Sequence, residues 1–148
     1  EENMHLTLKF LGKTSSKQLP EIIEAVSLCV EKQASFPMIL ERIGIFGSSY
    51  NARVVWVGIR ENLRLLKLQE CLVQELEKVG FLIDRQNFVP HFTLGRIKKI
   101  HHKDYFKRVM ESVEKGFIQE TIVDGFTLFE SVLTPDGPIY KTIKRFDF

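Results

Sequence analysis

The sequence contains one short motif twice, and its residues are suited to acid–base chemistry. His5-Leu6-Thr7-Leu8 and His91-Phe92-Thr93-Leu94 share the pattern His-x-Thr-x. In a β-strand, residues i and i+2 lie on one face, so each histidine is expected beside its threonine. Neutral imidazole accepts a proton and imidazolium donates one, both near neutral pH. Two such rings on opposite sides of one phosphorus atom would form an acid–base pair, while the threonine hydroxyls hold the phosphate oxygens.

A single His-x-Thr in a strand is more often part of a solvated surface than of a site. Repetition favours the site, because both copies have the same spacing and apolar neighbours. His101 and His102 are adjacent and do not share a strand face, and the usual zinc-ligand spacings are missing. The expected site therefore uses neither a metal nor a cofactor.

Hydropathy patterning predicts the elements that must position these residues. Apolar residues alternate over 4–11, from Met4 to Phe10, which predicts a strand. Helical periodicity covers residues 17–33, 61–79 and 102–115, and strand-like stretches cover 36–46, 52–59, 88–97, 117–132 and 139–147. The resulting order, β-α-β-β-α-β-α-β-β, predicts an α+β fold with mostly antiparallel strands. Because each half carries one motif and no linker separates them, we expect a single domain over 1–148 with two intertwined lobes.

Composition narrows the class of protein. The 148 residues are 44% apolar and carry a net charge of +2, which excludes wholesale disorder. No apolar run approaches the length of a membrane helix, so no membrane association is expected. Cys29 and Cys71 lie in segments with helical patterning and are predicted to be buried thiols rather than a disulfide. That prediction favours a reducing, cytoplasmic compartment.

Two further features remain open between a structural and a functional interpretation. Residues 96–103 form a basic run, which fits a solvated loop better than a contact strip for RNA phosphates. Phe10, Phe46 and Trp56 are predicted to be core residues, with stacking on a base as the alternative for the two phenylalanines.

The doubled motif and its surroundings resemble the 2H phosphoesterase superfamily, most closely its RNA 2′,3′-cyclic phosphodiesterases, historically called 2′-5′ RNA ligases. The resemblance extends over most of the chain and is carried by the segments His5–Gly12, Arg53–Gly58, Phe88–Arg96 and Glu130–Tyr140. It implies a bilobal fold of two mostly antiparallel sheets, with outer helices around a central cleft. Family members usually carry a strand and a helix before the first motif, and both are expected to be missing here, since the motif begins at His5.

The resemblance also implies roles for individual residues. His5 would donate a proton to the leaving ribose oxygen and His91 would accept one from water, although ligation or the reverse reaction exchanges these roles. Thr7 and Thr93 would bind the phosphate, and Arg96 would add positive charge. Strict strand alternation turns Arg96 away from His91, unless a bulge at Gly95 re-aims it.

The implied activity is hydrolysis of RNA 2′,3′-cyclic phosphate ends to 2′-phosphomonoesters, without metal or cofactor, by a monomer. An ATP-independent 2′-5′ ligation would be a side activity of the same site. The substrates would be RNA with 2′,3′-cyclic phosphate ends or cyclic nucleotides. The alternatives are another 2H phosphoesterase, acting on a different cyclic phosphate or RNA 3′ end, and a non-catalytic RNA-binding module.

Overall fold

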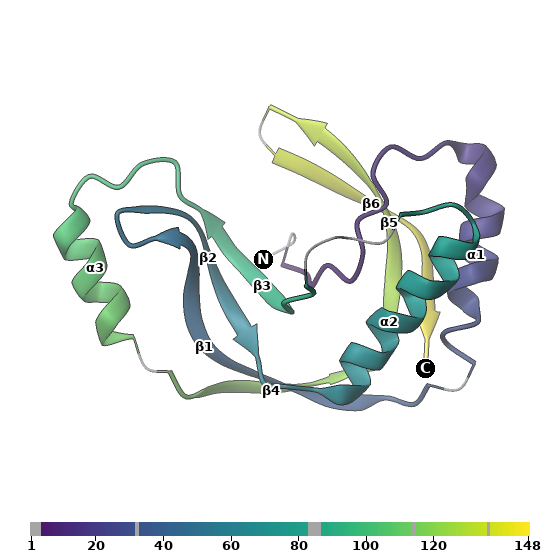
Figure 1. The fold of residues 1–148 in the computed structure, drawn as a ribbon, viewed down its shortest axis with the longest axis horizontal. Helices are drawn as coiled ribbons and strands as arrows, with labels where there is room; N and C mark the ends of the chain where they lie inside the picture. Colours follow the sequence, from purple (N-terminus) through teal and green to yellow (C-terminus); the bar gives the residue numbers. More distant parts are fainter. Residues whose placement is uncertain (1–3, 32, 83–86, 114, 136) are drawn as a thin grey trace. The chain divides into compact units, whose positions relative to one another are not determined.

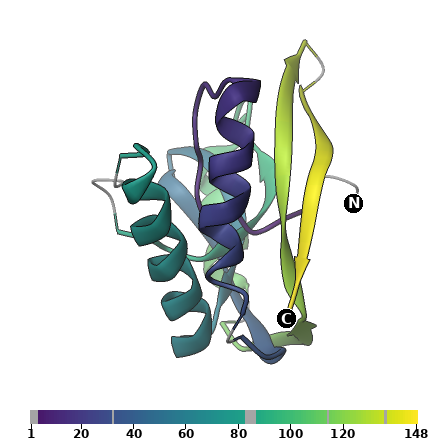
Figure 2. The ribbon, with the colours of Figure 1, turned by 90° about the vertical axis from the view of Figure 1, so that its right-hand side faces the viewer.

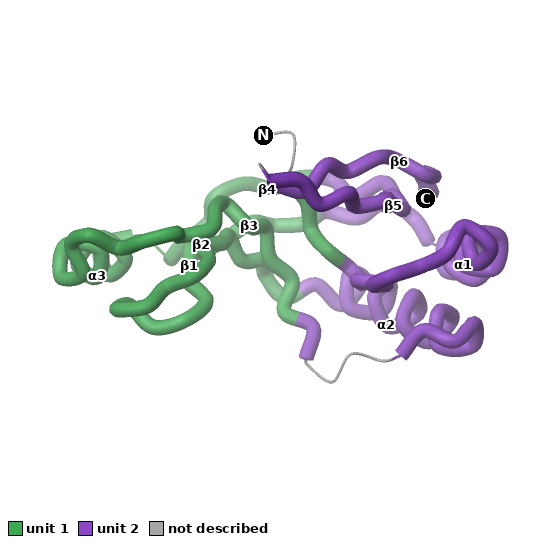
Figure 3. Tube along the Cα trace, turned by 90° about the horizontal axis from the view of Figure 1, so that it is seen from above, with its two compact units in different colours: residues 1–7, 38–61, 89–121 green, residues 8–37, 62–88, 122–148 purple. Residues whose placement is uncertain are grey.

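The computed structural model describes residues 4–148 except 32, 83–86, 114 and 136. The described elements confirm an α+β fold. In chain order they are η1 (Ser16–Gln18), α1 (Leu19–Ser27), β1 (Phe36–Ser48), β2 (Asn51–Ile59), α2 (Leu63–Lys78), β3 (His91–Arg96), α3 (Lys103–Ser112), β4 (Phe117–Val123), β5 (Gly125–Thr134) and β6 (Gly137–Asp147). The chain divides into two interleaved compact units, each built from three segments (Figure 3).

Unit 1, residues 1–7, 38–61 and 89–121, carries the strands around both His-x-Thr motifs. Its sheet has the order β3-β2-β1-β4, and β1, β2 and β3 pair antiparallel (Figure 1). Gly47 has a φ of +104° close to the β1–β2 turn, a backbone conformation that glycine adopts without steric cost. β3 is thus an edge strand of this sheet, with β2 on one side.

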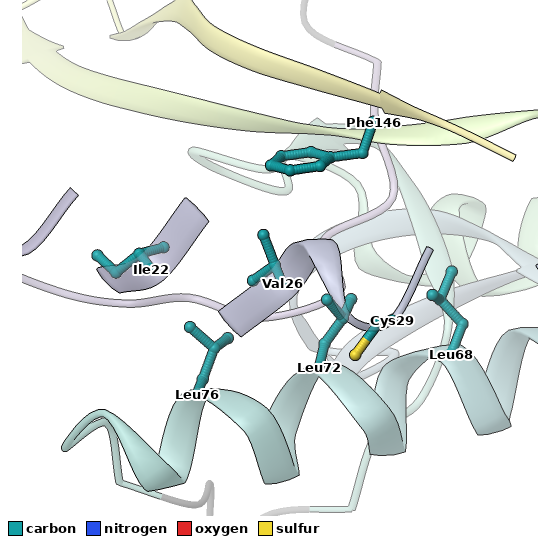
Figure 4. Packing of buried hydrophobic residues seen from close by; sticks show 7 residues of the cluster. All are labelled: Ile22, Val26, Cys29, Leu68, Leu72, Leu76 and Phe146. Atoms are coloured by element: carbon teal, nitrogen blue, oxygen red, sulfur yellow. The ribbon is translucent and has the colours of Figure 1, made fainter. Parts of the chain in front are cut away.

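Unit 2, residues 8–37, 62–88 and 122–148, contains the apolar core that anchors the chain. Helices α1 and α2 lie side by side next to the β5–β6 hairpin (Figure 2). Their apolar faces meet Phe146 of β6 in one cluster (Figure 4), whose buried members are Ile22, Val26, Cys29, Leu68, Leu72, Leu76 and Phe146. The side chain of Asn62 caps α2 by accepting hydrogen bonds from the N–H groups of Arg64 and Leu65, as its position in the sequence predicts.

The predicted strand over 4–11 is largely wrong. Its described residues make a single antiparallel bridge, between Leu6 and Phe92. Met4 is 54% exposed and Phe10 72% exposed, so Phe10 is not a core residue. Alternation of apolar residues marks a strand only where a partner strand runs alongside, and here the partner is met at one residue.

Two other predicted elements also differ. The stretch 117–132 is divided at Asp124, so that β4 joins the four-stranded sheet and β5 pairs with β6. Helix α3 has an amphipathic sequence, but none of its residues is buried, and Val109, expected inside, is 39% exposed. A helix packed against few neighbours keeps its periodicity without gaining a buried face.

The two cysteines form a disulfide, so the prediction of free thiols is wrong. Cys29 and Cys71 have their Cα atoms 5.8 Å apart, and Cys29 belongs to the core cluster of unit 2. Periodicity predicts that each cysteine faces a core, but it does not predict that the end of α1 and the middle of α2 meet there. The expectation of a reducing compartment loses its basis with this bond. Within the described ranges, no helix has the length and apolar character needed to cross a membrane.

Candidate active site

One backbone bridge brings the two His-x-Thr motifs together. Leu6 of the first motif pairs antiparallel with Phe92 of the second, and the histidine and threonine of each motif belong to unit 1. Paired residues point to the same face and their neighbours to the opposite face. Thr93 shares the face of His91 within β3, and continuing the register by one residue on each side of Leu6 would put His5 and Thr7 on that face, away from Leu6 and Phe92.

The same register sets the spacing within this group. Extended by one residue each way beyond the Leu6–Phe92 pair, it would face His5 with Thr93 and Thr7 with His91. Two histidines related diagonally across antiparallel strands have Cα atoms about 7–8 Å apart, and the separation of their Cβ atoms is somewhat smaller. A phosphate group with hydrogen bonds of about 3 Å on either side fits such a spacing. His5, His91 and Thr93 are half-buried and Thr7 is exposed, so the group is open to a ligand.

The protonation pattern of His91 follows from one hydrogen bond. Its Nδ1 lies 2.7 Å from the carbonyl oxygen of Val89. Because a carbonyl oxygen only accepts, Nδ1 must be the donor, and in the neutral ring Nε2 then holds the free lone pair. His91 is thus oriented by the backbone two residues before it, with a nitrogen available to accept a proton.

Two aromatic rings support His91 from the neighbouring strands. The imidazole centroid lies 4.8 Å from that of Phe46, edge to face, and 6.5 Å from that of Trp56. Trp56 is half-buried and Phe46 is 38% exposed, so the prediction that both are core residues is wrong. The sequence signal that could have found them is parity, since Trp56 pairs with Thr93 and therefore shares the face of His91.

Two glycines make room for the indole of Trp56. A Cβ on Gly44 would overlap the ring of Trp56, and a Cβ on Gly58 would lie 3.0 Å from its Cζ3 atom. Gly44 pairs with Trp56 and Gly58 pairs with His91, so both glycines lie on the site face. The indole consequently lies against the sheet beside the imidazole.

A bulge in β3 places Arg96 on the face of His91, as the sequence analysis required. Val55 pairs with Gly95 and Trp56 with Thr93, so Leu94 is the additional residue on β3. Beyond it Arg96 pairs with Val54, which shares the face of Trp56. The extra residue reverses the strand alternation, and Arg96 joins the face that carries His91 and Thr93.

Sequence reasoning missed a second arginine near this face. Arg42 sits in a bulge of β1 with a φ of +52°, a conformation uncommon for residues other than glycine. Its Nε lies 3.1 Å from the point that a Cβ on Gly58 would occupy, and Gly58 is the strand partner of His91. The signal is absent from the sequence, because only the bulge directs Arg42 to this face.

The chemistry available to the site is that of imidazoles, hydroxyls and guanidinium groups. In the described part of the chain, no cluster of three or more His, Cys, Asp or Glu residues has an arrangement that could hold a metal ion. The arrangement can bind an anion and transfer protons on two sides of it.

Comparison with known proteins defines the class. The sequence profile of the 2′-5′ RNA ligase superfamily matches residues 2–133, and this chain belongs to that superfamily. The family predicted from the doubled motif is thereby confirmed.

Individual relatives are similar along nearly the whole chain. The RNA 2′,3′-cyclic phosphodiesterase of Thermotoga maritima is 39% identical over 148 residues, which cover 100% of this chain and 77% of that protein. The enzyme of the same name from Methanocaldococcus jannaschii is 34% identical, with 98% and 80% covered.

Solved structures agree with this assignment and confirm the LigT-like fold. A protein of Thermus thermophilus gives a TM-score of 0.82 at 27% identity, with 97% of this chain and 77% of that chain covered. Escherichia coli LigT with 3′-AMP gives 0.78 at 25% identity, with 99% and 77% covered.

Proposed function

We propose that this chain hydrolyses the 2′,3′-cyclic phosphate at an RNA end to a 2′-phosphomonoester. The relatives named RNA 2′,3′-cyclic phosphodiesterase support the reaction. The observation that supports the proposal is the Leu6–Phe92 bridge, because its register, continued by one residue on each side, would set the two histidines diagonally across one face. A cyclic diester needs a proton removed from water and a proton supplied to the leaving oxygen, and two imidazoles can do both.

The proposed step uses each site residue once. His91 accepts a proton from water at Nε2 as the water oxygen attacks phosphorus, and His5 donates a proton to the ribose 3′ oxygen as its bond to phosphorus breaks. The threonine hydroxyls of Thr7 and Thr93 and the guanidinium of Arg96 bind the non-bridging oxygens, where negative charge develops. The product is the 2′-phosphomonoester with a free 3′ hydroxyl, and both histidines regain their starting states by proton exchange with solvent.

The same site would join RNA ends when a 5′ hydroxyl replaces water. That hydroxyl attacks phosphorus, the 3′ oxygen leaves with the proton of His5, and a 2′-5′ phosphodiester remains. No nucleotide cofactor is required, because the bond energy comes from the cyclic phosphate. One chain supplies all five site residues, which supports a monomer within a single bilobal domain.

The test is turnover of a nucleoside 2′,3′-cyclic phosphate by the wild type, His5→Ala, His91→Ala and His101→Ala. General acid–base catalysis contributes about 10²–10⁴-fold, so each of the first two variants should lose at least about 100-fold in kcat. His101→Ala is the matched control and should keep wild-type kinetics. The wild-type rate should fall on both sides of an optimum, since one histidine must be neutral and the other protonated. Full activity of either site variant, or a rate that is flat across neutral pH, would contradict the proposal.

A further inference from the structure

A basic hollow lies at the far end of β3 from His91. It has a volume of about 440 Å³ and is lined by residues from three segments of unit 1, among them Ala52, Ile97 and Ile100 and six polar or charged residues. These six are Tyr50 and Asn51 at the β1–β2 turn, Arg53 of β2, Lys98 and Lys99 after β3, and Lys103 at the start of α3. The hollow includes much of the basic run that the sequence analysis left open.

The charge of this hollow is of one sign. Its lining contains four cationic side chains and no carboxylate. Among the residues placed by the structure, none of these four cations takes part in an ion pair. Like charges gathered in a concave surface raise the local potential and favour an anionic ligand.

The cations are held by ordered backbone. The N–H of Ile97 donates to the carbonyl oxygen of Arg53 at 2.9 Å, which ties the segment after β3 to β2. Lys103 is the first residue of α3, whose N–H groups and dipole add positive character at that end. The hollow is therefore positioned by the sheet and the helix together.

Its place along β3 identifies what the anion belongs to. β3 runs from His91 to Arg96, about 17 Å at the rise of a strand, and the hollow begins just beyond Arg96. That distance exceeds the spacing of adjacent phosphates in a nucleic acid, so a strand that reached both places would have several nucleotides between them. Tyr50, which is 51% exposed, offers a ring on which a base can stack.

We propose that this hollow binds backbone phosphates of the substrate RNA several nucleotides to the 5′ side of the cyclic end. The inference rests on the proposed function, and it identifies the substrate as an RNA strand rather than a free cyclic nucleotide. Because phosphate contacts carry no sequence information, the hollow should favour length without favouring a sequence.

The test compares kcat/KM for substrates from a cyclic mononucleotide up to a cyclic-ended RNA of about eight nucleotides. Wild type should gain at least about tenfold with length. Lys98→Gln/Lys99→Gln should lose most of that gain and keep its activity on the mononucleotide. Loss of two single-strand phosphate contacts should also reduce the slope of log(kcat/KM) against log salt by about 1.4. Two controls should behave as wild type. The first is Lys98→Arg/Lys99→Arg, which keeps the charge of the hollow. The second is Lys13→Gln/Lys67→Gln, which removes the same charge from exposed positions of unit 2.

The outcomes separate this inference from the proposed function. If the wild type turned over the mononucleotide and its kcat/KM did not rise with RNA length, the proposed role of the hollow would be wrong, and the proposed function would be unaffected. If wild type turned over neither substrate, the proposed function would fail, and anisotropy of a labelled RNA with a 3′ phosphate would test the hollow alone. There, an unchanged affinity and salt slope in Lys98→Gln/Lys99→Gln would overturn it, and weaker binding with a reduced slope would support it.

Discussion

At the scale of single residues, the hydrogen bond from His91 to Val89 determines which ring nitrogen of His91 can exchange a proton with a ligand. It engages Nδ1 with a carbonyl oxygen and leaves Nε2 as the nitrogen that can take a proton. The resemblance to 2H phosphoesterases assigns the same role to His91, but it leaves open an exchange of roles. Because Nδ1 donates in both the neutral and the protonated ring, this hydrogen bond fits either role of His91, and the assignment of His91 as the base and His5 as the acid is a proposal that rests on the resemblance.

A sulfur leaving group tests this assignment. We expect a 2′,3′-cyclic phosphate with sulfur in place of the 3′ oxygen to restore much of the rate of His5→Ala, because a thiolate leaves without a proton. The same substrate should not rescue His91→Ala, in which activation of water is lost. Comparing the two rates with each substrate is the measurement, and rescue of His91→Ala alone would reverse the assignment.

At the scale of elements, close contact between strands holds the site together. Gly44 and Gly58 lie on the site face; a Cβ on Gly44 would overlap the ring of Trp56, and a Cβ on Gly58 would be in tight contact with it. Trp56 in turn contacts Phe46 and His91. The orientation of His91 therefore depends on glycines in two other strands.

Gly44→Ala should disturb this arrangement. Overpacking of this kind costs about 1–3 kcal/mol, so we expect the free energy of unfolding to fall by that amount. The kcat for the cyclic phosphate should also fall, because displacement of the indole moves the imidazole. Gly116→Ala, outside β1, β2 and β3, is the matched control, since a Cβ there has no atom within 4 Å. Equal stability and kcat in both variants would show that Trp56 does not position His91.

Local sequence patterns predicted where helices and strands lie better than they predicted which strands pair with one another. The β1–β2 hairpin, the Asn62 cap of α2 and the β5–β6 hairpin follow from turn residues, capping chemistry and alternation within a few residues. The strand over 4–11 failed because its partner contacts it at Leu6 alone. Gly95 marked β3 as a place where a bulge could re-aim Arg96, and a bulge forms there with Leu94 as the additional residue, whereas the bulge at Arg42 has no comparable sequence signal.

At the scale of the whole molecule, the division into two units separates stability from chemistry. The five site residues belong to unit 1, and both cysteines and the main apolar cluster belong to unit 2. The sequence pointed to the site because the same four-residue pattern occurs twice. It could not show the disulfide, because residues 42 apart meet only when α1 packs on α2.

Reduction of the Cys29–Cys71 bond should lower stability without abolishing activity. A crosslink across 42 residues restricts the unfolded chain and contributes up to about 4 kcal/mol. We therefore expect a reductant to lower the Tm of the wild type and to leave the Tm of Cys29→Ala/Cys71→Ala unchanged. Calorimetry with and without reductant makes the comparison. Two free thiols in the purified wild type, or a Tm that does not respond, would contradict the bond.

In the proposed mechanism, His5 and His91 contact one phosphate. The most direct test is an NMR titration with uridine 2′-phosphate, which is the product of the proposed reaction on a uridine substrate. The ring signals of His5 and His91 should move together, with one common dissociation constant. Those of His101 and His102 should stay in place and serve as internal controls. Movement of only one of the two site histidines, or two different dissociation constants, would contradict a shared phosphate.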